Sequence, residues 1–443
     1  MRNRLLCVIL IAVLSVSMLV QAAGEINLDK DIFVVETNID AIMKQGSHDF
    51  FGYQPVTDEF LFWVAHDYGE DVLKKIAENK NYSDPEVWFQ ITGKSIYVLY
   101  DEYASFVGMD AWDYSHVHRV EKEGDVSFVF SGDVTIHEGA ATTNHMDEVG
   151  GIDKCFSSDL MEIMQGADVF VVNNEFCYST RGEPTPGKDY TFRADPRRVE
   201  ALKELGTDLA CLANNHVFDY GADALTDTLQ ILRDADMPYI GAGENLQEAE
   251  RIQYYIAGGR KIAIVNATQI ERSTTFTREA TATQSGVFKT LHPENCVRAI
   301  RRAKRNADLC LVSVHWGTEG NEYYGGDQVS LANAFVEAGA DAIIGGHTHC
   351  LEGIEYIGDV PVFYSLGNYW FSTSANMPGD YDTGLAVIKV SQDGRITPSF
   401  VPARFHVAVT SLLTGDEALR VYGYLESVSQ TTSIDKKGKI KRR

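Results

Sequence analysis

The sequence of 443 residues predicts a layered α/β protein, a β-sandwich flanked by helices, with a small and mostly helical domain at its N-terminus. Two observations favour this fold. From residue 125 onward, short apolar runs alternate with amphipathic stretches of helical period, which is typical of layered α/β domains. The composition, 44% hydrophobic and 23% charged, is that of a globular chain, and the length allows a large core and a second domain.

The segment before this pattern divides into two parts. Residues 1–23 have the composition of an export signal, because Arg2 and Arg4 precede an apolar run over 5–20 and small residues follow for cleavage. An uncleaved run would instead anchor the chain in the membrane, so we expect a secreted or cell-surface protein, with retention through residues 5–20 as the alternative. Residues 24–122 are rich in aromatic and acidic side chains and form the predicted small helical domain.

Residues 123–410 carry the pattern of the main domain. Six apolar runs are predicted as strands: 126–130, 169–172, 209–212, 261–265, 309–314 and 342–344. The amphipathic stretches predicted as helices between them are 196–205, 222–235, 294–306 and 331–338. Beyond residue 352, the runs 354–357, 362–365 and 385–390 follow one another without helices, as hairpin strands do, so we expect mixed sheets.

The charge of the chain is uneven. Residues 411–443 form a C-terminal extension that ends in six cations, namely Lys436, Lys437, Lys439, Lys441, Arg442 and Arg443. We expect a solvated tail there, in preference to a contact with an acidic polymer or the cell surface. The whole chain has a formal net charge of −24, or −26 without Arg2 and Arg4, which argues against nucleic acid as a partner. An anionic substrate must therefore be attracted locally, for instance by metal ions.

The cysteines allow disulfides but do not require them. Cys7 lies in the apolar run of the predicted signal, and six others follow it. None of them has a CxxC partner, and Cys211 and Cys310 lie within apolar strand-like runs. Buried free thiols are therefore expected at least as much as bridges.

Five of the predicted strands end abruptly in polar residues. The endings are Ser131-Gly132-Asp133, Asn173-Asn174-Glu175, Asn214-Asn215-His216, His315-Trp316-Gly317 and Gly346-His347-Thr348-His349. A single aspartate at a strand end is commonly a cap, and a single histidine is commonly a core residue. The pair His347 and His349 is more specific, because side chains two apart in an extended segment face the same side. Since α/β folds place ligands at the carboxyl ends of strands, we expect the five endings to converge on one crevice.

The residue types at these endings indicate a metal site. Aspartate, glutamate, asparagine and histidine without a thiolate suit manganese, iron, zinc or magnesium rather than a closed structural zinc site. A carboxylate shared by two ions would explain why so many ligands are present, and two such ions can activate water and clamp the attacking and leaving oxygens. His216, adjacent to Asn215, is placed to protonate a leaving group.

The same endings, together with Asp219-Tyr220-Gly221, Gly241-Ala242-Gly243 and Tyr364-Ser365-Leu366-Gly367-Asn368, resemble the poly-γ-glutamate capsule biosynthesis proteins of the CapA family. These proteins are related to calcineurin-like metallophosphoesterases, and the resemblance implies that fold. It also implies that Glu175 bridges two metal ions, that Asp133 and His349 bind one ion, and that His216 acts as the acid. The other ion would be held by Asn215, His315 and His347.

The sequence departs from the ordinary phosphoesterase pattern at two positions. Thr135 stands where a histidine is usual, and Glu175 replaces the usual bridging aspartate. His137 is a substitute ligand for the first ion, although a surface position is the simpler expectation for it. Candidates for shaping the substrate pocket are Arg193, Glu271, Arg272, Glu319 and Asn368, which lie in or beside loops after strand-like runs. Most residues in such positions are solvated or capping, so none is assigned a catalytic role.

Three functions are consistent with these features. The leading hypothesis is an exported metal-dependent hydrolase-like protein that acts in synthesis, release or trimming of an anionic capsule polymer such as poly-γ-glutamate, by cleaving a phosphoester or a γ-glutamyl amide. The alternative is a non-catalytic accessory protein that binds the polymer beside the capsule synthesis machinery at the membrane. The third hypothesis, a purely structural secreted domain, ranks last. It requires that all five polar strand endings are caps that occur together by coincidence.

Overall fold

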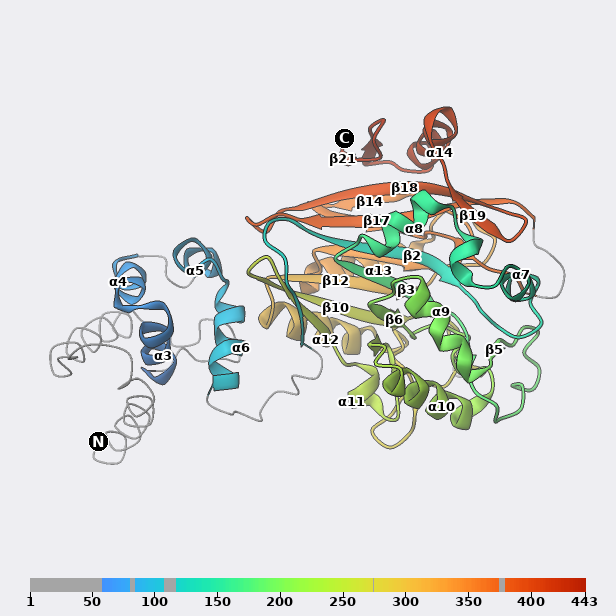
Figure 1. The fold of residues 1–443 in the computed structure, drawn as a ribbon, viewed down its shortest axis with the longest axis horizontal. Helices are drawn as coiled ribbons and strands as arrows, with labels where there is room; N and C mark the ends of the chain where they lie inside the picture. The colour runs from blue at the N-terminus through green and yellow to red at the C-terminus, as the bar shows by residue number, and fades with distance from the viewer. Residues whose placement is uncertain (1–57, 80–83, 107–116, 274, 374–378) are drawn as a thin grey trace. The chain divides into compact units, whose positions relative to one another are not determined.

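The computed structural model describes residues 58–79, 84–106, 117–273, 275–373 and 379–443 and divides the chain into two compact units, Met1–Trp112 and Asp113–Arg443 (Figure 1). The predicted signal or anchor at 1–23 lies outside the described residues. Among the helices that the structure describes, none combines the length and the apolar character needed to cross a bilayer.

The first unit is helical where it is described, which confirms the prediction of a helical N-terminal region. Its helices are α3 (Asp58–Tyr68), α4 (Glu70–Glu78), α5 (Pro85–Thr92) and α6 (Ile96–Phe106). Aromatic rings fill the space between them: the ring of Phe60 lies 6.0 Å from that of Trp88 and 5.6 Å from that of Tyr100. Helix α5 begins at Pro85, after Asp84 accepts a hydrogen bond from the Glu86 amide, as helix starts commonly do.

The second unit is built on two mixed sheets. The seven-stranded sheet has the order β1 (Val117–Val120), β9 (Gln253–Ala257), β10 (Arg260–Thr268), β12 (Leu309–His315), β13 (Ala342–Gly346), β15 (Val360–Phe363) and β14 (Ile354–Ile357). The eight-stranded sheet has the order β19 (Val409–Leu412), β18 (Ile396–His406), β17 (Tyr381–Val390), β2 (Val126–Val134), β3 (Val169–Asn174), β6 (Leu209–Cys211) and β7 (Tyr239–Ile240), and β16 (Asn368–Trp370) also pairs with β2.

The two sheets pack face to face with helices outside both, which confirms the predicted sandwich (Figure 1). Within β3, Val171 belongs to the core between the sheets, while its neighbour Phe170 belongs to the core under the outer helices. Burial on both faces explains why the strands are nearly continuous apolar runs. Helices α8 (Ser158–Gln165), α9 (Val199–Glu204) and α10 (Gly221–Asp234) cover the eight-stranded sheet, and α12 (Pro293–Arg305) and α13 (Gly326–Ala338) cover the other.

The remaining elements lie outside these two sheets and the helices that cover them. They are α7 (Ala141–Val149), α11 (Leu246–Ala249), α14 (Gly415–Ser427), β4 (Cys177–Tyr178), β5 (Arg193–Ala194), β8 (Ala242–Gly243), β11 (Gly286–Val287), β20 (Thr432–Ile434), β21 (Ile440–Arg442) and the 3₁₀ turns Ile152–Cys155 and Pro196–Arg198. Strand β1 pairs in parallel with β9, so the larger unit begins before residue 123. The domain boundary predicted from the sequence lies at residue 123.

The C-terminal extension is folded onto the second unit. Val421 and Leu425 of α14 and Ile440 of β21 join the core between the sheets. The carboxylate of Glu355 on β14 accepts hydrogen bonds from the amides of Gln430 (2.5 Å) and Thr431 (2.7 Å). The expectation of a solvated tail is therefore wrong for the backbone, because Ile440 has an apolar core to enter.

The cysteines follow the prediction. The six in the described part of the chain are all free thiols, five of them buried and Cys350 partly so.

Candidate metal centre

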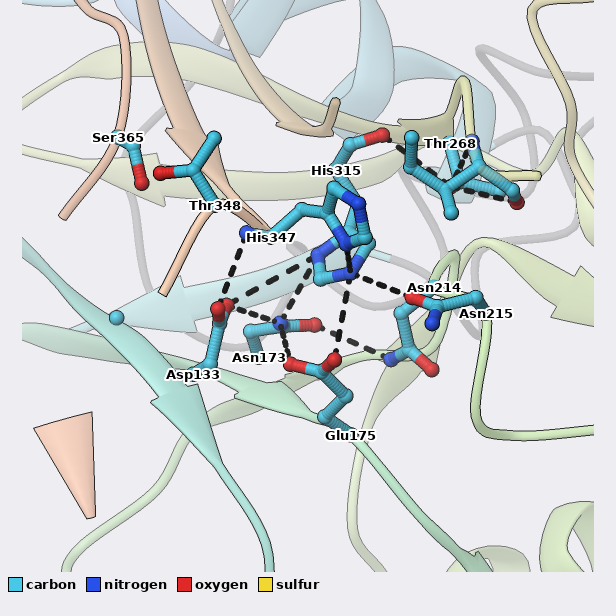
Figure 2. Close-up of polar contacts among 12 residues, drawn as sticks. Asp133, Asn173, Glu175, Asn214, Asn215, Thr268, His315, His347, Thr348 and Ser365 are labelled. Atoms are coloured by element: carbon cyan, nitrogen blue, oxygen red, sulfur yellow. Dashed lines mark hydrogen bonds and ion pairs between the residues drawn. The ribbon is translucent and has the colours of Figure 1, made fainter. Parts of the chain in front are cut away.

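The five polar endings converge at one edge of the sandwich. Asp133 lies in β2, Glu175 directly follows β3, and Asn215 and His216 follow β6 of the eight-stranded sheet. His315 ends β12, and His347 and His349 follow β13 of the facing sheet. Because the strands that bear these endings run parallel within each sheet, their carboxyl ends meet at the same edge. Figure 2 shows Asp133, Glu175, Asn215, His315 and His347 turned toward one another.

One compact ligand group lies at the centre. Glu175, His315 and His347 are buried, and one potential ligand atom from each lies within 4.8 Å of the others. Nε2 of His315 is 3.4 Å from Oε1 of Glu175 and 3.2 Å from Nδ1 of His347. The same Nε2 lies 2.8 Å from Oδ1 of Asn215. These four residues are the set that the resemblance implies for one ion, with Glu175 as the shared carboxylate.

A looser group lies beside it. Oδ2 of Asp133 is 3.9 Å from Nδ1 of His349 and accepts a hydrogen bond of 3.0 Å from the His347 amide. Nδ1 of His349 lies 2.7 Å from Oδ1 of Asn368, which orients the ring. The side chain of His349 is 24% exposed, whereas that of Asp133 is fully buried, so this group faces the open side of the centre.

The electrostatics of the compact group fit a cation. Glu175 is fully buried, and its Oε1 accepts no hydrogen bond from any residue that the structure describes. Burial raises the pKa of Glu175 to about 8 and lowers that of His315 to about 4. Burial also lowers the pKa of His347. Two neutral imidazoles therefore face a carboxylate oxygen that accepts no hydrogen bond. This set of ligand atoms suits manganese, iron or zinc.

The histidines after β13 are not in an extended segment, and that part of the sequence argument is wrong. Strand β13 ends at Gly346, and the backbone then takes φ values of +92° at His347 and +61° at His349, a region that residues with a Cβ rarely adopt. The turn places the two rings 6.1 Å apart. Such strain is common at functional sites. Gly346 is required, because a Cβ there would lie 2.6 Å from Oδ1 of Asp133.

His216 is held beside the centre by a buried aspartate. Its Nδ1 lies 2.7 Å from Oδ2 of Asp219, and its Nε2 lies 3.9 Å from Oε1 of Glu175. Asp219 also accepts hydrogen bonds from Nζ of Lys188 (2.5 Å) and the amide of Phe192 (2.7 Å). Burial lowers the pKa of His216 to about 4 despite the charge of Asp219. A neutral His216 whose Nδ1–H donates to Asp219 presents a bare Nε2 to the centre.

Several residues of the centre were missed by sequence reasoning. Nδ2 of Asn173 lies 2.7 Å from Oδ1 of Asp133 and 3.3 Å from Oε2 of Glu175, so its amide donates to both carboxylates. Asn173 belongs to the quoted ending Asn173-Asn174-Glu175, but nothing in the sequence indicates that Asn173, rather than Asn174, donates to the carboxylates. Asp219 belongs to the quoted stretch Asp219-Tyr220-Gly221, three residues after His216, but no sequence signal indicates that it contacts His216.

His137 is neither a surface residue nor part of the compact group. It is 6% exposed, and its ring stacks on Phe192 with centroids 4.4 Å apart. The ring of His216 also stacks on Phe192, at 4.1 Å. Phe192 therefore separates His137 from the centre, and Nδ1 of His137 lies 3.1 Å from Oγ1 of Thr135.

Comparison with known proteins identifies a matching family and several relatives. The model of the family described as "Bacterial capsule synthesis protein PGA_cap" matches residues 127–373. The capsule biosynthesis protein CapA of Bacillus anthracis is 36% identical over 217 residues, which cover 46% of this chain and 51% of the relative. The PGA biosynthesis protein CapA of Bacillus subtilis (strain 168) is 34% identical over 185 residues, covering 42% and 48%.

A probable polyglutamine synthesis accessory protein of Mycobacterium tuberculosis is 29% identical over 208 residues, which cover 45% of this chain and 55% of that protein. The chain thus spans about half the length of the relatives that it matches. The family model matches more than half of the chain, and its span contains every residue of the candidate centre. The chain belongs to the bacterial capsule synthesis protein PGA_cap family.

Proposed function

We propose that this chain is an exported metal-dependent hydrolase-like protein that acts in the synthesis, release or trimming of an anionic capsule polymer such as poly-γ-glutamate. One observation carries the proposal: a fully buried glutamate, Glu175, offers an oxygen without a hydrogen-bond donor to two buried histidines. A buried carboxylate in that state is unfavourable unless a cation joins it. The family, and relatives named for capsule and PGA biosynthesis, support the polymer.

The ligand roles proposed here follow the two groups of the centre. Glu175 would be shared by two ions, one of them held also by Asn215, His315 and His347 and the other by Asp133 and His349. When bound, divalent ions supply Lewis-acid activation of water and stabilise charge on the reacting oxygens. The first group is the more compact, because one potential ligand atom each of Glu175, His315 and His347 lies within 4.8 Å of the others.

His216 is proposed to move the proton. Asp219 holds its Nδ1–H, so the ring cannot turn, and Nε2 stays directed toward Glu175. Nε2 takes up a proton from the attacking water and gives it to the leaving oxygen or nitrogen, and such general acid–base catalysis contributes about 10²–10⁴-fold in enzymes. Lys188 donates to both the Asn215 carbonyl and Asp219, and this ties His216 to the ligand loop.

Elemental analysis of the purified protein after loading with manganese, zinc or iron tests the centre. The wild type is expected to hold close to two ions per chain, and Glu175→Ala and His347→Ala are expected to lose them. His292→Ala is the matched control, because its side chain is 64% exposed and pairs only with Glu294 among the described residues. Negligible metal in the wild type after every loading would refute the proposal. A metal-loaded protein is then assayed for hydrolysis of phosphoesters and γ-glutamyl polymers.

A specific observation favours the non-catalytic alternative. The amide of Asn173 already donates to Oδ1 of Asp133 and Oε2 of Glu175, two oxygens that a second ion would otherwise join. An accessory protein beside the capsule machinery would then bind polymer carboxylates through one ion. Incubation of metal-loaded protein with poly-γ-glutamate separates the two functions. Shortened polymer, detected by size-exclusion chromatography and absent with His216→Ala, supports the hydrolase, whereas retained polymer of unchanged length supports the accessory role.

A further inference from the structure

The loop that follows β10 is built against the centre. The Gln269 amide donates a hydrogen bond of 2.8 Å to the His315 carbonyl, and the amide of Gly317 donates to Oε1 of Gln269 at 3.3 Å. Oγ1 of Thr277 donates to the Asn215 carbonyl at 3.0 Å. The loop is therefore attached to the backbone of two proposed metal ligands from opposite sheets, and it borders the centre.

A buried lysine that the proposed function does not use fixes this loop. Nζ of Lys289 donates hydrogen bonds to the carbonyls of Glu271 (2.9 Å) and Ser273 (2.6 Å), the residues on either side of Arg272. Lys289 is 0% exposed, and burial lowers its pKa to about 8. The carboxylate of Glu271 in turn accepts from the amide of Phe276 at 3.1 Å. Burying an ammonium to hold two loop carbonyls is unfavourable unless that conformation is needed.

The two hydrogen bonds from Lys289 position Arg272, whose guanidinium has N–H groups that no described residue accepts. The side chain of Arg272 is 48% exposed. Its described polar contacts all use Nη2, which lies 3.1 Å from the Gly317 carbonyl, 3.5 Å from Oε1 of Gln269 and 3.6 Å from Oδ2 of Asp327. Nε and Nη1 have no partner among the described residues. The carbonyl that Nη2 contacts belongs to Gly317, two residues after the proposed ligand His315, so the guanidinium lies beside the loop that carries this ligand.

We propose that Arg272, held by Lys289, is the anion-binding group of the substrate site and receives an oxyanion of the substrate beside the loop that follows His315. This inference rests on the proposed function and names the recognition chemistry of that site. A guanidinium binds carboxylate and phosphoryl oxygens with two parallel hydrogen bonds, and in a chain of net charge −24 such a group has to be placed locally. The shared chemistry is an oxyanion, either an α-carboxylate of a γ-linked glutamate chain or a phosphoryl group.

Equilibrium binding tests the inference without relying on activity. All proteins carry His216→Ala, so that probes are not consumed, and are loaded with manganese. Fluorescein-labelled penta-γ-glutamate is titrated by fluorescence anisotropy, and phenyl phosphate is titrated by calorimetry. Arg272→Ala is compared with Arg272→Lys, which keeps the charge but loses the paired donors. Arg395→Ala is the matched control, because that side chain is 82% exposed and pairs only with Asp393 among the described residues.

We expect Arg272→Ala to raise the Kd of the bound probe at least tenfold, Arg272→Lys to raise it less, and Arg395→Ala to leave it unchanged. Lys289→Met is expected to raise Kd as well, with no further loss when it is combined with Arg272→Ala, because both act through one group. Binding of phenyl phosphate but not of penta-γ-glutamate, lost in Arg272→Ala, supports this inference and contradicts the polymer proposed above. An unchanged Kd in Arg272→Ala overturns the inference and leaves the proposed function standing. Binding of neither probe to the parent also overturns it.

Discussion

Replacement of Glu175 by glutamine is expected to stabilise the metal-free protein and to abolish its stabilisation by metal. The carboxylate is fully buried, and Oε1 has no donor in the described part of the chain, so the charged form is unfavourable in the folded state. Glutamine has nearly the same shape and no charge, and its oxygen can keep the hydrogen bond from Asn173. The substitution therefore removes an electrostatic penalty without opening a cavity.

The size of the gain follows from the pKa of Glu175. Folding raises this pKa from an ordinary 4.5 to about 8, so the proton binds more tightly to the folded chain than to the unfolded chain. Below pH 4.5 the group is neutral in both states, and the penalty is absent. As the pH rises from 4.5 to 8, the carboxyl group loses its proton in the unfolded chain first. The resulting penalty on the folded state reaches on the order of 3 kcal/mol at pH 7 and about 5 kcal/mol above pH 8.

Thermal unfolding between pH 5 and pH 8.5 in the presence of a chelator measures this effect. Glu175→Gln is expected to melt at least about 5 °C above the wild type at pH 8 and close to it at pH 5. Added manganese is expected to narrow the difference, because only the wild type binds it, and a concentration of about 100 Kd offsets about 2.7 kcal/mol of the penalty. Glu294→Gln serves as the control, since its side chain is 66% exposed.

A gain that does not change with pH would refute this reasoning, as would a glutamine variant that is less stable than the wild type at pH 8. Either outcome would mean that the carboxylate of Glu175 is satisfied in the metal-free protein. The argument that a cation completes the centre would then lose its main support.

Two further predictions concern the residues around the centre. Asp219→Asn is expected to lower kcat by about 10²-fold or more for alkyl phosphates but much less for p-nitrophenyl phosphate, because a good leaving group needs little help from His216. The metal content is expected to stay unchanged. Equal losses of kcat for both substrates would contradict the role of His216 as the acid. Glu355→Gln is expected to lower the free energy of unfolding by roughly 2 kcal/mol and to speed proteolysis near Thr431, since charge-assisted hydrogen bonds to the C-terminal segment are lost. Denaturant titration measures the free energy, and limited proteolysis measures the cleavage rate. An unchanged cleavage rate would contradict the idea that Glu355 holds this segment.

The features predicted from the sequence are those with local causes. A strand buried on both faces, such as β3, has to be an apolar run, and its polar ending at Glu175 is visible at once. The same pattern at Asp133, His315 and His347 was enough to predict their convergence, because parallel strands align their carboxyl ends. The order of the layers also followed from the alternation of strands and helices.

The features that were missed have non-local causes. Strand β1 is short and polar, and it became recognisable only through its pairing with β9. The fold of the C-terminal hairpin depends on a distant carboxylate, Glu355, that accepts from its backbone. The backbone turn at His347 and His349 is imposed by packing against β2 and has no sequence signal beyond the glycines before it. Register and strain of this kind arise from tertiary contacts.

The position of β2 has a consequence for how the chain is made. Strand β2 is the first of its sheet in the sequence, yet it lies in the interior, and its antiparallel neighbour β17 pairs Leu385 with Ser131. During translation this edge of β2 therefore stays open until β17 has left the ribosome. Such high contact order slows folding and leaves an unpaired strand available to other chains. Nascent chains that end before residue 381 are thus expected to depend on chaperones, because β17 is not yet present to cover β2.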